Sequence, residues 1–387
     1  MNTRRFRTRT EFIERNNGKI PGVWEIALDL GYSAVKTFSP NGIACFPSYA
    51  KRIDDSFQFA GNAPRESIVY RNLDTDEMWV VGEVAQNIMI SGDTSDSEAS
   101  LYGRERYSNA MYSVISDVGL GIASMENQYG APGKDRIVIQ TGLPEKYMGD
   151  EYELKDSLSG AHNFALRLGN GEWKKFHINV NKDDVFVMSQ PKGTLFSVCI
   201  NKDGRFHQDA AKYLSSSILV FDPGFGTLDL FPIVSGVVGK GETYSDLGMK
   251  RVLQETSKLI KENYNVDIPV PSMQKYLESG VVRYVNKKTF ESKEYPFDKL
   301  LAEANNKVCD EAINRMVSAI NLIDYNYMIV TGGTGAAWLY NIQEKFKNFS
   351  TLKIINGNQN DELPFIYSNV RGYYLYRFNK LGKEMGA

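Results

Sequence analysis

SILVFDPGFGTLDLF, residues 217–231, is an apolar run that stops at Asp222, turns through two glycines and resumes as a second apolar run. A stretch with the same pattern, WEIALDLGYSAVKTF, occupies residues 24–38. When Asp29 is aligned with Asp222, both stretches read Asp-x-Gly-aromatic-small, and Phe follows five residues later. The offset of 193 residues is close to half of the 387-residue chain, which indicates one strand–turn–strand unit used twice.

Each turn places glycines where backbone N–H groups can approach an anion without interference from a side chain. Lys36, on the returning strand of the first hairpin, can reach a phosphate group as a point charge, whereas Pro223 removes one N–H donor from the second turn. One such hairpin alone is an ordinary turn, and only its duplication favours a binding role. The residues expected to bind phosphate are Gly31, Tyr32, Ser33 and Lys36 in the first hairpin and Gly224, Phe225, Gly226 and Thr227 in the second.

Two further features point to a nucleotide. Asp29 and Asp222 end their strands, and two carboxylates beside a polyphosphate suit the outer shell of Mg²⁺, which keeps most of its waters. The run Gly332-Gly333-Thr334-Gly335 follows a short strand and opens a helix, so that a helix N-terminus is available for adenosine or a phosphate. The chain has no Gly-x-x-x-x-Gly-Lys-Ser/Thr motif, which excludes a P-loop enzyme.

Composition and charge set the broad class. The chain is 42% hydrophobic and 24% charged, as in soluble globular proteins, and its length predicts two domains. A net charge of −2 and the lack of a basic helix-turn-helix pattern argue against direct sequence-specific DNA binding. Three widely spaced cysteines favour a reducing, cytoplasmic location over a disulfide framework. No stretch is apolar enough to span a membrane.

Periodicity predicts alternating strands and helices in both halves. Strands are expected at 24–29, 35–38, 136–144, 163–168, 174–180, 184–189 and 327–331, and helices at 105–125, 247–264, near 298–322 and at 336–346. We expect residues 1–22 to form an N-terminal extension. Domain I is predicted to comprise 23–190 and 358–387 with a small inserted subdomain at about 45–100, and domain II to comprise 191–357.

The order of DLGYSAVK (29–36), DPGFGTLD (222–229) and VTGGTG (330–335) resembles the two phosphate motifs and the adenosine motif of the actin, Hsp70 and sugar-kinase ATPase superfamily. The resemblance covers about residues 24–380 and is strongest to bacterial actin-like proteins of the ParM and Alp type, which segregate plasmids. YSNVRGYYLY (367–376) is similar to their closing segment. The resemblance implies an actin-like α/β fold with two similar domains, each with a subdomain, around a nucleotide cleft.

The same resemblance implies the chemistry. ATP with Mg²⁺ would lie between the halves, with Asp222 and, more weakly, Asp29 holding metal-bound waters. Gln190, in the predicted strand VFVMSQPKG (185–193), falls where ParM has its catalytic Glu and actin has Gln, so it would orient the attacking water. Lys250 would contact the sugar edge by family position, and Gly332, Gly333 and Thr334 would bind the nucleotide. The implied partners are a second copy, in a head-to-tail filament, and a small DNA-binding adaptor protein.

Three other functions remain open from the sequence. A metabolite kinase of the same superfamily should carry an acidic general base, and Gln190 argues against it. An Hsp70-like ATPase needs a substrate-binding segment after the core. A membrane-associated bacterial cytoskeletal actin needs an amphipathic segment, for which only Phe6, Phe12 and Ile13 among the N-terminal arginines are candidates.

Overall fold

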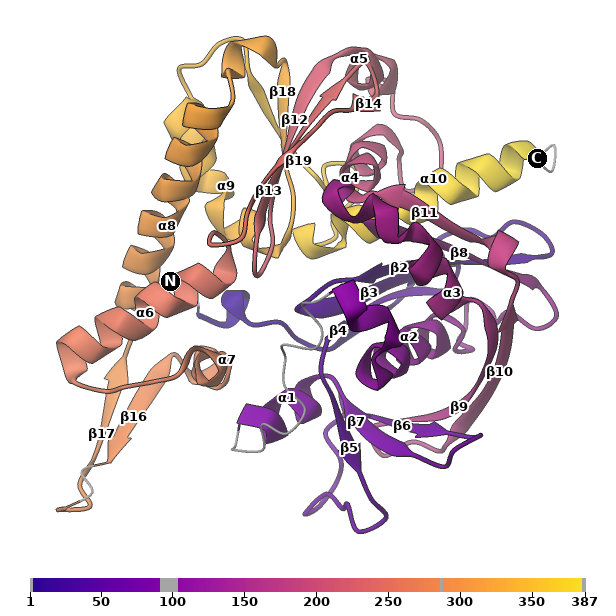
Figure 1. The fold of residues 1–387 in the computed structure, drawn as a ribbon, viewed down its shortest axis with the longest axis horizontal. Coiled ribbons are helices and arrows are strands. Elements are labelled where there is room, and N and C mark those ends of the chain that lie inside the picture. The colour runs from indigo at the N-terminus through magenta and orange to yellow at the C-terminus, as the bar shows by residue number, and fades with distance from the viewer. Residues whose placement is uncertain (1–2, 91–103, 286–287, 385–387) are drawn as a thin grey trace. The chain divides into compact units, whose positions relative to one another are not determined.

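A computed structural model of the chain describes residues 3–90, 104–285 and 288–384. The chain forms two compact units (Figure 1). The hairpin-1 unit, named for the Asp29 hairpin, comprises Thr8–Ala210 and Tyr367–Ala387, and the hairpin-2 unit, named for the Asp222 hairpin, comprises Met1–Arg7 and Ala211–Ile366. The chain therefore changes unit after residue 210, whereas the sequence placed the boundary after residue 190, and the predicted subdomain extends past residue 90 onto residues outside those described.

The main sheet of the hairpin-1 unit has six strands in the order β1-β4-β3-β2-β8-β11. Its strands are β1 (Glu11–Glu14), β2 (Val23–Leu30), β3 (Ala34–Ser39), β4 (Gly42–Pro47), β8 (Arg136–Leu143) and β11 (Val185–Ser189). All eight residues of β2 are buried, because both faces of this strand are covered. Trp24, Ile26 and Leu28 face the core that contains α2 (Ala110–Ala123), and α10 (Ser368–Glu384) packs against the same strand.

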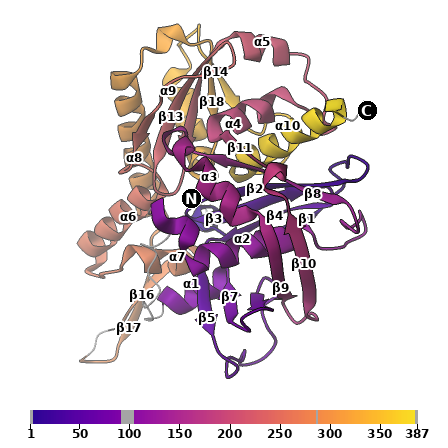
Figure 2. The same ribbon diagram turned by 45° about the vertical axis from the view of Figure 1, so that its right-hand side comes forward.

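A second sheet in this unit has five strands in the order β10-β9-β6-β7-β5. Its strands are β5 (Ala50–Ile53), β6 (Ile68–Asn72), β7 (Met78–Val81), β9 (Gly160–Leu168) and β10 (Lys174–Val180). The predicted subdomain at 45–100 therefore supplies only part of the sheet, because residues 160–180 complete it through the pairing of β6 with β9. Helix α2 lies between the two sheets (Figures 1 and 2).

The remaining elements of the hairpin-1 unit are short. They are α1 (Glu83–Ile90), α3 (Glu151–Leu158), α4 (Gln190–Cys199) and the 3-10 turns η3 (Arg104–Ser108), η4 (Glu145–Asp150) and η5 (Lys182–Asp184). The prediction that residues 185–193 form one strand was wrong: β11 ends at Ser189 and Gln190 is the first residue of α4. The local reason is Pro191, since proline in the first helical turn loses no hydrogen bond.

The hairpin-2 unit is built around a sheet in the order β14-β13-β12-β18-β19, with β15 paired to β13. Its strands are β12 (Ser217–Pro223), β13 (Leu228–Val234), β14 (Val237–Val238), β15 (Glu242–Tyr244), β18 (Tyr327–Val330) and β19 (Lys353–Asn356). Its helices are α5 (Ala210–Ser215), α6 (Met249–Tyr264), α7 (Val270–Ser279), α8 (Asp298–Ala319) and α9 (Gly333–Phe346), with the 3-10 turns η6 (Leu322–Asp324) and η7 (Phe365–Tyr367). Leu219 and Phe221 of β12 share one core with α6, α8 and α9.

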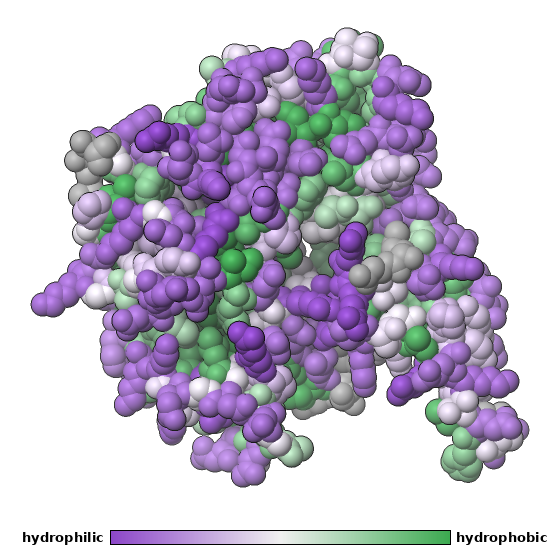
Figure 3. Space-filling view, turned by 180° about the vertical axis from the view of Figure 1, so that it is seen from behind, coloured by the Kyte–Doolittle hydropathy of each residue, from purple (hydrophilic) through white to green (hydrophobic). Residues whose placement is uncertain are grey.

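A separate two-stranded ribbon, β16 (Val281–Val285) with β17 (Ser292–Pro296), projects from the hairpin-2 unit (Figure 1). Most of the face in Figure 3 is hydrophilic, and hydrophobic surface is confined to small separate patches. One such patch lies at the end of this ribbon, where Val285 and Phe290 are exposed.

The predicted N-terminal extension is not a solvated tail. Residues Thr3–Phe6 form the 3-10 turn η1, and Phe6 is only 6% exposed in the core of the hairpin-2 unit. Residues Glu11–Glu14 form β1, which pairs with β4 in the hairpin-1 unit. Phe6 is therefore not available for the membrane contact that the sequence left open.

Candidate functional site

The two Asp-x-Gly hairpins have the same strand register. In the first, Asp29 lies opposite Lys36 and Leu30 opposite Val35; in the second, Asp222 lies opposite Asp229 and Pro223 opposite Leu228. The cross-strand partners of the two hairpins are therefore also separated by 193 residues, as are Asp29 and Asp222. Each hairpin also has a parallel neighbour on the same side, β8 beside β2 and β18 beside β12.

The two turns also close in the same way. The N–H of Gly31 donates to the carbonyl of Ala34 at 3.1 Å, and the N–H of Gly224 donates to the carbonyl of Thr227 at 2.8 Å. These two glycine N–H groups are thus used inside the turns, although the sequence assigned both glycines to phosphate. The candidate donors to an anion are the N–H groups between the closing residues, those of Tyr32 and Ser33 in the first turn and those of Phe225 and Gly226 in the second.

The first hairpin carries a buried ion pair. Lys36 Nζ donates to Asp29 Oδ2 at 3.1 Å, and Asp29 is 4% exposed. A Cβ added to Gly31 would lie 3.0 Å from Lys36 Nζ, so the ammonium group lies against the turn. Ser48, the residue after β4, holds the turn, because its hydroxyl donates to the carbonyl of Gly31 and its N–H to that of Ser33. The lysine is well placed for an anion at this turn, but its pairing with Asp29 competes with the predicted metal role of that carboxylate.

The ring of Tyr32 has a partner that the sequence did not reveal. The guanidinium carbon of Arg106, in η3, lies 5.2 Å from the centre of the Tyr32 ring. The same group lies 5.1 Å from the ring of Tyr107 and 5.4 Å from that of Tyr112. The cation–π contact with Arg106 holds the Tyr32 side chain against η3.

In the second hairpin, the turn is held by the N-termini of two helices. The carbonyl of Gly224 accepts a bond from the N–H of Met249 at 3.2 Å and from the Thr334 hydroxyl at 2.7 Å. The carbonyl of Phe225 accepts from the N–H of Lys250 at 2.8 Å. The carbonyl groups of Gly224 and Phe225 point to the N-termini of α6 and α9. The backbone N–H groups of the turn therefore lie in the same region of the unit as the positive ends of both helices.

Gly332 is packed against the end of the hairpin. It has φ +75°, and a Cβ there would collide with the Asp222 carboxylate and with the carbonyl of Pro223. Gly335 also touches Pro223, because a Cβ there would lie 3.6 Å from its ring. The structure thus brings Asp222, Gly332 and Thr334 together.

Sequence analysis missed Asp229. It lies directly opposite Asp222, so both side chains are on the same face of the hairpin. The hydroxyls of Thr227 and Thr243 donate to it at 2.9 and 2.6 Å. Lys36 occupies the equivalent position in the first hairpin. An alignment of the two repeats could therefore have identified Asp229 from the sequence. Among the described residues no group of three or more His, Cys, Asp or Glu side chains could hold a metal, so a cation here would rely on this pair and on water.

Gln190 and the closing segment lie in the hairpin-1 unit. Gln190 is half-buried at the start of α4, and α10 packs closely on that helix where a Cβ on Gly372 would collide with the carbonyl of Gly193. The buried Arg371 donates to the carbonyls of Ser197 and Ile200 at 2.6 and 3.0 Å. The closing segment therefore acts as a support for α4 and so fixes the backbone that carries Gln190.

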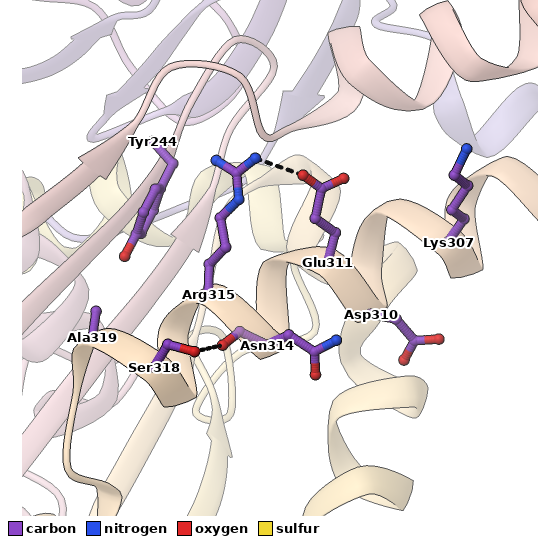
Figure 4. A pocket seen from close by; sticks show the side chains of 8 residues that line it. All are labelled: Tyr244, Lys307, Asp310, Glu311, Asn314, Arg315, Ser318 and Ala319. Atoms are coloured by element: carbon purple, nitrogen blue, oxygen red, sulfur yellow. Dashed lines mark hydrogen bonds and ion pairs between the residues drawn. The ribbon is translucent and has the colours of Figure 1, made fainter.

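Two other features of the hairpin-2 unit were compared with this site. Lys250, the second residue of α6, is exposed. A hollow along α8 faces Tyr244 (Figure 4). Its cations already have partners, since Arg315 bonds to Glu311 and Asp246 and Lys307 bonds to Glu255. That hollow is a poor candidate for a phosphate site.

The duplicated hairpin sheets agree with the comparison to known proteins. Residues 27–193 match the family model for the N-terminal domain of actin-like proteins. The chain has an actin-like fold. The match begins in β2 and ends in α4, so it includes the first hairpin and Gln190 of this actin-like chain.

Solved structures of actin-like proteins extend the likeness in fold to 92–94% of the chain. A non-polymerisable quadruple mutant of pCBH ParM is 19% identical, with a TM-score of 0.66 over 94% of this chain and 99% of that one. A 15-stranded ParM filament from Clostridium botulinum is 18% identical in sequence, with a TM-score of 0.64 over 92% of this chain and 99% of that one. The archaeal actin homologue Ta0583 in complex with ADP is 15% identical in sequence, with a TM-score of 0.60 over 92% of this chain and 99% of that one. At these identities the likeness shows the fold.

Two comparisons were negative. No curated protein sequence matches this actin-like chain. Within the described ranges 3–90, 104–285 and 288–384, none of the helices has the length and apolar character needed to cross a membrane.

Proposed function

We propose that this actin-like protein binds ATP with Mg²⁺ through its two hairpins and hydrolyses it as it assembles into head-to-tail filaments. The observation that carries the proposal is the duplication of the hairpin with the same turn bond and the same register. A turn with glycines and backbone N–H donors suits a phosphate group, and the chain has two such turns. The ADP complex of Ta0583 and the ParM filament, both of the same fold, support the nucleotide and the assembly respectively.

The residues present fit such a ligand. Lys36 and the amides of Tyr32, Ser33, Phe225 and Gly226 would bind phosphate oxygens, and Asp222 with Asp229 would hold the waters of the metal. Mg²⁺, when bound, supplies positive charge to the phosphate oxygens. Gln190, neutral at the start of α4, would orient the attacking water, and α10 would keep its backbone in place.

The wider role is also a proposal. A filament whose subunits join head to tail does not close, so it can grow and push a cargo. We place plasmid or phage DNA as that cargo, linked through a small DNA-binding adaptor, because the net charge of −2 gives no general attraction to DNA. Cys45, Cys199 and Cys309 are free and buried, which supports a cytoplasmic location for this filament.

The test uses the purified full chain with ATP and Mg²⁺. Phosphate release and light scattering should both rise with protein concentration, and negative-stain microscopy should show filaments. Asp222→Ala should abolish phosphate release, whereas Glu242→Ala, which removes an exposed carboxylate on β15, should not. Flat scattering at tens of micromolar protein, together with sugar-stimulated ATP consumption, would instead establish the metabolite kinase alternative.

A further inference from the structure

Residues 3–14 contribute to both units. The chain passes between the units at three places, after Arg7, after Ala210 and after Ile366. The last two passages connect the large parts of each unit. The first is an additional link, because residues up to Arg7 belong to the hairpin-2 unit and residues from Thr8 onward belong to the hairpin-1 unit.

The anchor in the hairpin-2 unit is η1 on α7. Phe6 is buried in the unit's core, and the hydroxyl of the buried Thr3 donates to the carbonyl of Leu277 at 2.7 Å. Arg7 forms an ion pair with Glu278 at 3.2 Å. Gly280, at the C-terminus of α7, has φ +69°, and a Cβ there would lie 3.1 Å from the Thr3 hydroxyl, so the helix end is shaped around this turn.

The anchor in the hairpin-1 unit begins three residues later. The N–H of the buried Thr10 donates to Glu83 at 2.6 Å, next to Gly82, whose added Cβ would lie 3.2 Å from the Thr10 hydroxyl. Four consecutive residues of β1 then pair with β4. The hydroxyl of Tyr367 donates to Glu11 at 2.8 Å.

The link between the anchors is short. Phe6 and Thr10 are four residues apart, and an extended chain spans at most about 3.6 Å per residue, so their Cα atoms cannot separate by more than about 14 Å. This limit follows from covalent geometry and holds for any arrangement of the units while both anchors are bound. The η1 anchor depends on one buried aromatic and a few polar contacts, whereas β1 has a full strand ladder, so η1 is the end that releases first.

We propose that residues 3–14 form a strap that limits the separation of the two units, and that undocking of η1 from α7 lengthens it. The strap is a property of the chain without nucleotide, so its test is independent of ATP binding. With η1 docked, the units have three connections and a restricted range of motion. With η1 released, only the connections after residues 210 and 366 remain, and the range widens.

The first test measures the distance between the units by double electron–electron resonance in the full, nucleotide-free chain. Spin labels are placed on Glu66→Cys and Lys275→Cys, which are exposed and lie in different units, while the three native cysteines are buried. Phe6→Ala and deletion of residues 2–7 should each broaden the distance distribution toward longer values. Arg5→Ala, an exposed residue of the same turn, is the matched control and should leave the distribution unchanged. Identical distributions in all four proteins would overturn the proposal.

The second test does not depend on the stability of Phe6→Ala. A Cβ on Gly280 would lie 4.0 Å from the Cβ of Thr3, within the range of a disulfide. Thr3→Cys with Gly280→Cys should therefore form a bond within one chain, identified as a linked peptide from the monomer by mass spectrometry. Failure to link, or linkage between two chains, would overturn the proposal; linkage between chains would show that η1 docks on a second copy.

Discussion

Asp229 lies directly opposite Asp222 across the second hairpin, at the position that Lys36 holds opposite Asp29 in the first. One repeat thus contains an ion pair and the other contains two carboxylates on the same face. Like charges directly opposite each other destabilise a strand pair, and a bound cation relieves that cost. The two repeats therefore differ in charge at this one position, with a lysine in the first hairpin and a carboxylate in the second.

This relationship predicts the behaviour of Asp229→Asn. The variant should lose most Mg²⁺-dependent phosphate release, because one of the two carboxylates that face the cation is gone. Without Mg²⁺ it should be more stable than the parent by roughly 0.2–1 kcal/mol, the usual size of a cross-strand charge effect. Thermal unfolding with and without Mg²⁺ measures both effects. A parent protein that Mg²⁺ does not stabilise would contradict the assignment of this pair to a cation.

Gln190→Ala should separate binding from hydrolysis. We expect ATP affinity to be retained and hydrolysis to fall by about 10²-fold, the effect typical of the loss of one positioning group. Single-turnover phosphate release and nucleotide binding are the measurements. Lys192→Ala, an exposed residue on the first turn of the same helix, is the control. If hydrolysis by Gln190→Ala is unchanged, the role lies elsewhere, and Glu145 in η4 is the next residue to substitute.

Gly332 and Gly333 form a matched pair of substitutions. Gly332→Ala forces a side chain against Asp222 at a positive φ, and strain of this kind costs about 1–3 kcal/mol. Gly333→Ala meets only Ile366 at 4.0 Å and should change the stability by less than about 0.5 kcal/mol. Denaturation midpoints of the two variants, followed by nucleotide binding, test this. Equal midpoints would show that Gly332 and the hairpin are not packed as described.

His162 gives a pH dependence in the hairpin-1 unit. Its Nδ1 lies 2.7 Å from Asp117 Oδ1 and its Nε2 3.3 Å from the carbonyl of Leu158, so the protonated ring can donate from both nitrogens. Burial lowers the pKa of His162, but the hydrogen bond and charge of Asp117, together with the hydrogen bond to the carbonyl of Leu158, outweigh it, and the net shift of the pKa is upward. The stabilisation is therefore complete below the unfolded pKa of about 6.5 and is lost as the pH rises through the folded pKa.

His162→Gln should consequently be less stable than the parent at pH 6, and the difference should shrink by pH 9. Urea denaturation at the two pH values measures it. His177→Gln, at an exposed histidine on β10, serves as the control and should show no such change. A stability difference that grows with pH would contradict the direction of the shift.

Some features missed by the sequence analysis had a local signal. Pro191 marks the start of α4, and the duplication itself points to Asp229 once Lys36 is placed. Other features had no local signal in the sequence. The pairing of β6 with β9 joins segments about 95 residues apart, and a strand pattern does not name its partner. The contact of Arg106 with Tyr32 likewise joins residues that are far apart in the sequence, and a local pattern does not identify such a contact.

The sequence by itself determined both hairpins, their turns and the order of the three glycine motifs, because an Asp-x-Gly turn is fixed by residues a few positions apart. The actin-like fold followed from that order and is confirmed. Only the tertiary structure decided which side chains meet at the turns: Lys36 with Asp29, Asp222 with Asp229 and Gly332 with Asp222. It also decided that residues 3–14 contribute to both units, since the burial of Phe6 and the pairing of β1 depend on surfaces formed by residues far along the chain.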